Sequence, residues 1–109
     1  MKRLQYLNLA LLVIFITVLI GSCSTNTTTD TSSLYVPTAA NVTANATLLE
    51  LQQGRSLFIA NCNKCHNLYS PDNYSPTQWK NILSNMAPRT GMSQAQIVLV
   101  TKYVCKGQQ

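Results

Sequence analysis

The chain has 109 residues, a hydrophobic content of 46% and a formal net charge of +5. This length has room for one small domain. The basic residues are dispersed, with no basic run and no interleaved aromatic residues, which argues against a nucleic-acid-binding surface.

The first 22 residues have the order of regions that is typical of an export signal. A short positive start precedes an apolar stretch from Leu4 to Ile20, and the small residues Gly21 and Ser22 stand directly before Cys23. Small residues followed by cysteine resemble the bacterial lipobox, in which the cysteine becomes the lipidated N-terminus of the mature protein.

We therefore expect residues 1–22 to be a lipoprotein signal peptide and Cys23 to carry the lipid. The mature protein would be exported and anchored to a membrane, facing the periplasm or the cell exterior, with a net charge of +3. Each buried methylene of an acyl chain contributes about 0.8 kcal/mol to anchoring. The alternative is an uncleaved transmembrane helix, because the apolar stretch approaches the ~20 residues that span a bilayer.

Residues 23–46 are expected to form a lipidated, flexible tether. Ser, Thr, Asn and Ala dominate this segment, and such a composition cannot bury enough apolar surface to offset the entropy of ordering it. Leu34, Tyr35 and Val36 are the exception, and we interpret them as a short apolar patch in a loop. A flexible segment of ~20 residues has a reach of about 25 Å, which would let an anchored domain swing.

Residues 47–109 are predicted to form an all-α domain. Its first helix starts after Thr47, which forms a capping box with Glu50. Apolar or small residues recur there at helical spacing, namely Leu48, Leu51, Gly54 and Phe58. Because Gly54 lies on this apolar stripe, we expect it to let another helix cross closely.

Two more capping boxes predict two more helices, one at Ser75 with Gln78 and one at Ser93 with Gln96. The second helix would stop before Pro88. The expected buried stripes are Trp79, Ile82, Leu83 and Met86 in the second helix, and Ile97, Val100, Thr101 and Val104, with Tyr103 beside them, in the third. A domain of about 60 residues has a marginal core and needs a staple or an apolar group to wrap around.

Cys62, Cys65 and His66 form a CxxCH motif, the signature of c-type haem attachment. Two thiols one helical turn apart add to the two vinyl groups of a haem, and the adjacent histidine ligates the iron. We therefore expect one covalent haem c.

Three other interpretations explain the motif less well. A thioredoxin-like site would need a preceding strand, whereas a helix leads into this motif. A zinc site would need a second pair of ligands, and only Cys105 is left over. A disulfide between Cys62 and Cys65 would explain neither the histidine nor the small core.

The spacing from Gly54 and Phe58 to the CxxCH motif, followed by a C-terminal helix with Tyr103, resembles the small bacterial class I cytochromes c. The resemblance covers about 60 residues and implies a compact fold of about three helices around one haem. In that family the first helix crosses the last one at the glycine, and aromatic residues pack beside the crossing.

The sixth iron ligand is expected to be methionine, because the chain has no second histidine. In the family this ligand precedes the last helix by several residues, which favours Met86 over Met92. The alternative is that both methionines only fill apolar space. Cys105 is expected to be a small buried apolar residue, with a cross-link between two chains as the alternative.

These features predict an electron carrier and not an enzyme, with no small-molecule substrate. Its partners would be redox proteins such as an oxidase, a reductase or a dehydrogenase, which carriers of this kind bind through small, transient interfaces. The alternative is a haem-based sensor or a peroxidase-like enzyme with an open sixth iron position. No distal histidine is present to activate peroxide, and Arg89 is the only cation close to Met86 in the sequence.

Overall fold

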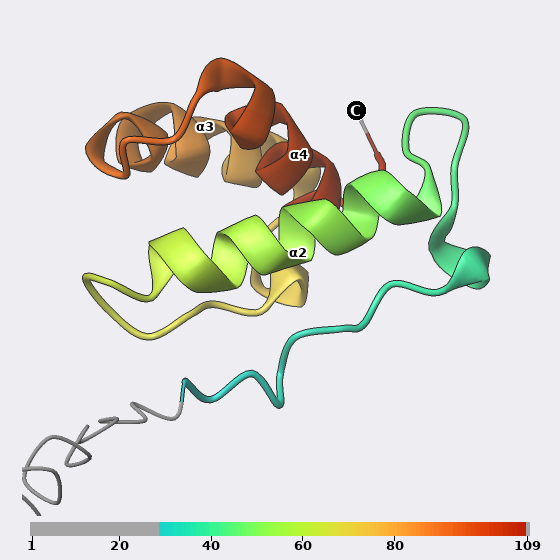
Figure 1. The fold of residues 1–109 in the computed structure, drawn as a ribbon, viewed down its shortest axis with the longest axis horizontal. Helices are drawn as coiled ribbons and strands as arrows, with labels where there is room; N and C mark the ends of the chain where they lie inside the picture. The colour runs from blue at the N-terminus through green and yellow to red at the C-terminus, as the bar shows by residue number, and fades with distance from the viewer. Residues whose placement is uncertain (1–28, 109) are drawn as a thin grey trace, which may run out of the picture.

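The computed structural model describes residues 29–108, and this part of the chain is an all-α domain without β-strands (Figure 1). The three predicted helices are confirmed. The predicted signal peptide and Cys23 lie outside the described residues. The elements are η1 (Ala39–Asn41), α2 (Leu48–Cys62), η2 (Pro71–Asn73), α3 (Pro76–Met86), η3 (Ala87–Arg89) and α4 (Gln94–Val104).

Each of the three α-helices begins at its predicted capping box. The hydroxyls of Thr47, Ser75 and Ser93 each accept a hydrogen bond at 3.3 Å from the backbone N–H three residues later. The side chain of that later residue bonds back to the N-cap amide, so two otherwise unpaired donors are satisfied. The helix boundaries therefore follow from local chemistry.

Helices α2 and α4 cross in close contact at Gly54, as the sequence predicts (Figure 1). A Cβ atom at position 54 would lie 2.1 Å from the backbone oxygen of Leu99 and 2.8 Å from the Cβ of Tyr103. Only glycine fits this crossing without moving a helix.

The core lies between the three α-helices. The ring centroid of Phe58 is 6.0 Å from that of Trp79 and 5.8 Å from that of Tyr103, which joins the three helices through aromatic contacts. The buried residues of this core cluster are Leu34, Phe58, Trp79, Leu83, Val100, Tyr103, Val104 and Cys105.

Residues 29–46, which we call the strap, differ from the expected flexible tether. Leu34 is buried, and the ring of Tyr35 stacks on that of Tyr103 with centroids 4.7 Å apart. The Tyr35 hydroxyl donates to the Tyr103 carbonyl at 2.8 Å, and the Tyr103 hydroxyl donates to the Tyr35 carbonyl at 3.0 Å. A few apolar side chains and a reciprocal pair of hydrogen bonds thus order a segment whose average composition predicts disorder.

Further contacts fasten the strap along its length. The Arg55 Nε–H donates to the Tyr35 carbonyl at 3.1 Å, and the Thr43 hydroxyl donates to the Gly107 carbonyl at 3.1 Å. The Lys106 ammonium lies 5.6 Å from the centroid of the Tyr35 ring. In the described structure, residues 29–46 therefore pack against the three helices.

Among residues 29–108, no helix is both long enough and apolar enough to cross a membrane.

Candidate functional site

Three of the predicted site residues, Cys62, His66 and Met86, line one cavity of about 260 Å³. The end of α2, the loop that follows it and α3 contribute its walls. The other lining residues are mainly apolar or aromatic, namely Phe58, Leu68, Tyr69, Tyr74, Trp79, Ile82 and Leu83. The fold thus brings together residues up to 28 positions apart in the sequence, from Phe58 to Met86.

Cys62 is the last residue of α2, and its thiol is half-buried. Burial, together with the neighbouring Cys65, raises the pKa of the Cys62 thiol to about 11. Cys65 is exposed and does not line the cavity, and none of the three described cysteines is in a disulfide. Both thiols of the motif are therefore free in this structure.

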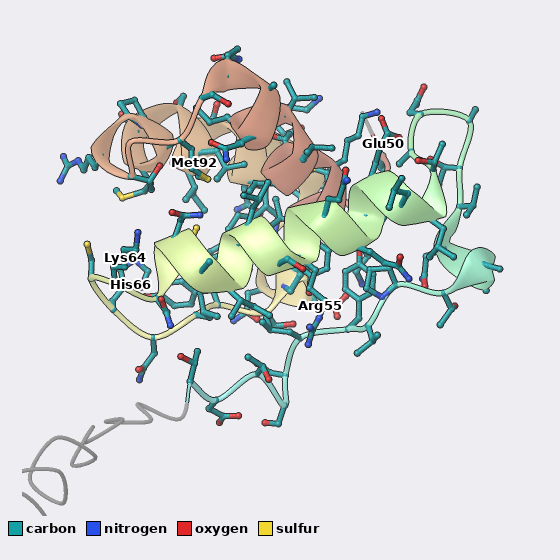
Figure 2. The ribbon with its side chains drawn as sticks, viewed as in Figure 1. Glu50, Arg55, Lys64, His66 and Met92 are labelled. Carbon is teal, nitrogen blue, oxygen red and sulfur yellow. The ribbon has the colours of Figure 1, made fainter. Side chains whose placement is uncertain are left out.

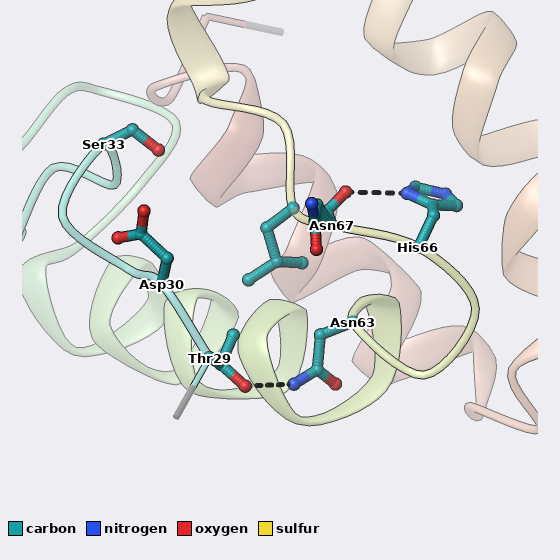
Figure 3. Close-up of a pocket in the computed structure, with 7 residues that line it drawn as sticks. Thr29, Asp30, Ser33, Asn63, His66 and Asn67 are labelled. Atoms are coloured by element: carbon teal, nitrogen blue, oxygen red, sulfur yellow. Dashed lines mark hydrogen bonds between the residues drawn. The ribbon is translucent and has the colours of Figure 1, made fainter. Parts of the chain in front are cut away.

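His66 has one ring nitrogen committed to the backbone. Its Nδ1 lies 2.7 Å from the carbonyl oxygen of Asn67 (Figure 3). A carbonyl oxygen only accepts, so Nδ1 is the donor in this hydrogen bond, and in the neutral imidazole the lone pair then lies on Nε2. This is the tautomer in which a second hydrogen bond orients a histidine that ligates a metal through Nε2.

The two candidate methionines differ in position. Met86 ends α3 and lines the cavity although its side chain is 42% exposed. Met92 does not line this cavity and packs against the core cluster, half-buried. Figure 2 labels His66 at the end of α2 and Met92 on the side of α3 and α4.

An aromatic wall on one side of the cavity was missed by the sequence reasoning. The centroid of the Tyr74 ring is 5.8 Å from that of Tyr69 and 5.2 Å from that of Trp79, and the Trp79 Nε1–H donates to the Pro71 carbonyl at 2.9 Å. Tyr74 directly precedes the N-cap Ser75, and Trp79 is the fourth residue of α3. That spacing is a hydrophobic staple, and it was the signal available in the sequence.

A second, polar cavity of about 400 Å³ lies between the strap and the CxxCH loop (Figure 3). Asn63, which is inside the motif, donates from Nδ2 to the Thr29 hydroxyl at 2.6 Å. The amide and hydroxyl of Ser32 both donate to the Asp30 carboxylate and hold the pKa of that carboxyl below its usual value. The lining residues are Thr29, Asp30, Ser33, Asn63, His66, Asn67 and Leu68.

The ion pairs leave positive charge unbalanced in the described part of the chain. Glu50 pairs with Lys102 at 2.5 Å, and Asp72 pairs with Lys106. Four other cations have no acidic partner among residues 29–108, namely Arg55, Lys64, Lys80 and Arg89. The surface is therefore mildly basic around these positions.

Cys105 is buried, with 2% of its surface exposed, and its Sγ lies 3.7 Å from the Pro76 carbonyl oxygen. Burial also raises the pKa of its thiol. The position agrees with the expected small buried residue, and burial of the thiol does not favour a cross-link between two chains.

Between residues 29 and 108, no three histidine, cysteine, aspartate or glutamate side chains gather as a metal site. A haem iron takes only two ligands from the protein, so this finding does not bear on haem. No protein-family model, curated protein or solved structure matches the chain significantly. The residues of the site are therefore what points to a function.

The residues around the apolar cavity fit the chemistry of a covalent haem. The Cys62 thiol, the His66 imidazole and the Met86 thioether line the cavity, whose other walls are apolar and aromatic, and the second free thiol, Cys65, lies exposed in the loop after α2.

Proposed function

We propose that the chain is an exported mono-haem c-type cytochrome, anchored by a lipid on Cys23, that carries single electrons between redox proteins. Cys62 and Cys65 would attach the haem covalently, and His66 and Met86 would ligate its iron. One observation carries the proposal: Cys62, His66 and Met86 line the same apolar cavity.

Each residue has a defined task in this proposal. The hydrogen bond from Nδ1 to the Asn67 carbonyl orients His66 and keeps Nε2 available. Met86 offers a soft thioether, which gives a higher reduction potential than a second histidine would. When bound, the haem supplies the one-electron iron couple. The aromatic wall would limit the access of water to the haem.

The surface chemistry supports a carrier with transient partners. The unbalanced charges of Lys64, Lys80 and Arg89 would steer an acidic redox partner at low ionic strength. Interfaces of such carriers bury less than ~1,200 Å², which allows rapid release. The sequence holds one histidine in all, so no second imidazole is available to activate peroxide.

The test is an optical spectrum of protein matured in a host that attaches haem c, recorded in both redox states. We expect a covalent haem with reversible one-electron redox chemistry and a ferric methionine–iron charge-transfer band. Met86→Ala should abolish that band, and the matched variant Met92→Ala should keep it. A colourless protein with free thiols at Cys62 and Cys65 would refute the proposal.

Carbon monoxide distinguishes the carrier from a sensor or a peroxidase-like enzyme. Fast, stoichiometric binding to the reduced wild-type protein would show an open sixth position and would favour the sensor or enzyme. A carrier with Met86 on the iron should bind carbon monoxide slowly, and Met86→Ala should bind it fast.

A further inference from the structure

We infer that the strap holds the CxxCH end of the domain toward the membrane that carries the anchor, so that the redox partner is a protein of the same membrane. This inference rests on the lipid anchor at Cys23 in the proposed function. The chain enters the described structure at Thr29, directly beside the motif.

The contact at that entry point is direct. The Asn63 side chain, inside the CxxCH motif, donates to the Thr29 hydroxyl at 2.6 Å, and both residues line the polar cavity together with His66. Figure 1 shows the start of the strap on one side of α2, with α3 and α4 on the other side. Figure 2 labels Lys64 and His66 at the end of α2 that lies near this start.

The connection from the anchor to Thr29 is short. Six residue steps separate Cys23 from Thr29, and a fully extended chain spans at most about 3.3–3.6 Å per residue. Thr29 can therefore lie no more than about 20 Å from the lipidated residue. If the strap did not pack against the helices, the first residue held by the domain would be Thr47, and its distance from Cys23 could reach roughly 80 Å.

Several contacts hold the strap against the helices and so keep the distance from Cys23 to the domain short. Leu34 is 4% exposed, Tyr35 stacks on Tyr103, and Arg55 and Thr43 add hydrogen bonds at separate points along it. Releasing it would expose apolar surface and leave the Tyr103 hydroxyl without its acceptor. The anchored domain thus keeps the motif near the bilayer.

This arrangement selects the kind of partner. A redox protein embedded in or bound to the same membrane can reach the CxxCH end from the side, along the bilayer. A freely diffusing protein would have to enter the narrow space between the domain and the lipid.

The test compares the accessibility of two exposed lysines, Lys64 in the motif and Lys80 on α3, in the full acylated protein on lipid vesicles. A membrane-impermeant amine-reactive reagent labels the lysines, and peptide mass spectrometry gives the labelling rate of each lysine. Unanchored Cys23→Ser protein gives the reference rates. We expect anchoring to slow the labelling of Lys64 severalfold and to change that of Lys80 little. A variant with a Gly/Ser segment as long as the strap inserted after Ser24 leaves every described contact intact and should lose the selective protection.

Equal slowing of both lysines, no slowing of either, or selective protection that persists in the lengthened variant would overturn the inference. A mature protein without acyl chains on Cys23 would overturn it as well. The haem proposal fails separately, because it is judged by the colour of the same sample and the lysine labelling does not depend on it.

Discussion

Replacing Gly54 by alanine tests the close crossing of α2 and α4. The new Cβ would lie 2.1 Å from the Leu99 backbone oxygen, so α2 must move away by about 1.3 Å to reach ordinary contact. Overpacking of this kind costs about 1–3 kcal/mol, and the obstacle here is backbone, which no side-chain rotation relieves. Alanine regains up to about 1 kcal/mol of helix propensity. Because the backbone obstacle places the cost near the upper end of that range, about 3 kcal/mol, we expect a net loss of about 2 kcal/mol in the free energy of unfolding.

For a domain of this size, a loss of about 2 kcal/mol lowers Tm by roughly 8–16 °C. Thermal and urea unfolding followed by far-UV circular dichroism measure both quantities. Gln53→Ala, at the exposed neighbouring position on α2, is the matched control and should stay within about 0.5 kcal/mol of the wild type. A Gly54→Ala protein as stable as the wild type would show that the helices do not cross as closely as described.

Three further predictions concern other contacts. In protein made without haem, iodoacetamide should alkylate Cys65 faster than Cys62. Cys65 is exposed, whereas burial raises the pKa of the Cys62 thiol to about 11. Equal alkylation rates, measured by mass spectrometry, would contradict this prediction. Glu50→Gln keeps the cap but loses the ion pair with Lys102, which lowers the pKa of the Glu50 carboxyl to about 2. The folded-state pKa of Glu50 lies below the ordinary value of 4.5, so the ion pair stabilises the fold above pH 4.5. Glu50→Gln should therefore be less stable than the wild type above pH 4.5, and the difference should vanish as the pH falls toward about 2. A difference in Tm that does not change with pH would count against the ion pair. Tyr35→Ala removes a stacked ring and the hydrogen bond from the Tyr35 hydroxyl to the Tyr103 carbonyl, and should cost about 2 kcal/mol and expose the strap to proteases. Phe in its place should keep the stack, and unchanged cleavage rates in the alanine variant would argue against a docked strap.

The elements of this domain were readable from short stretches of sequence. Thr47, Ser75 and Ser93 each stand three residues before a Glu or Gln, and the helices begin there because the two side chains pair within one turn. The role of Gly54 was also predictable, because a glycine on an apolar stripe marks a close approach. The CxxCH motif is local as well, which is why it could be recognised without a structure.

The strap could not be predicted in this way. Its order comes from Tyr35 meeting Tyr103, 68 residues later, and composition averaged over the segment does not register one such contact. The aromatic wall was missed for a related reason: Tyr69 is recognised as part of the cavity only when the loop after α2 is seen to fold back along α3.

The sequence by itself determined where the three helices start, that Gly54 lets another helix approach α2 closely, and that two thiols and an imidazole are neighbours in the chain. Only the tertiary structure decided that Met86, and not Met92, lines the cavity with Cys62 and His66, and that the chain reaches the domain beside the motif. Caps and motifs depend on neighbours within a helical turn, whereas cavities and docked segments depend on how distant elements pack, and that packing is a property of the whole chain.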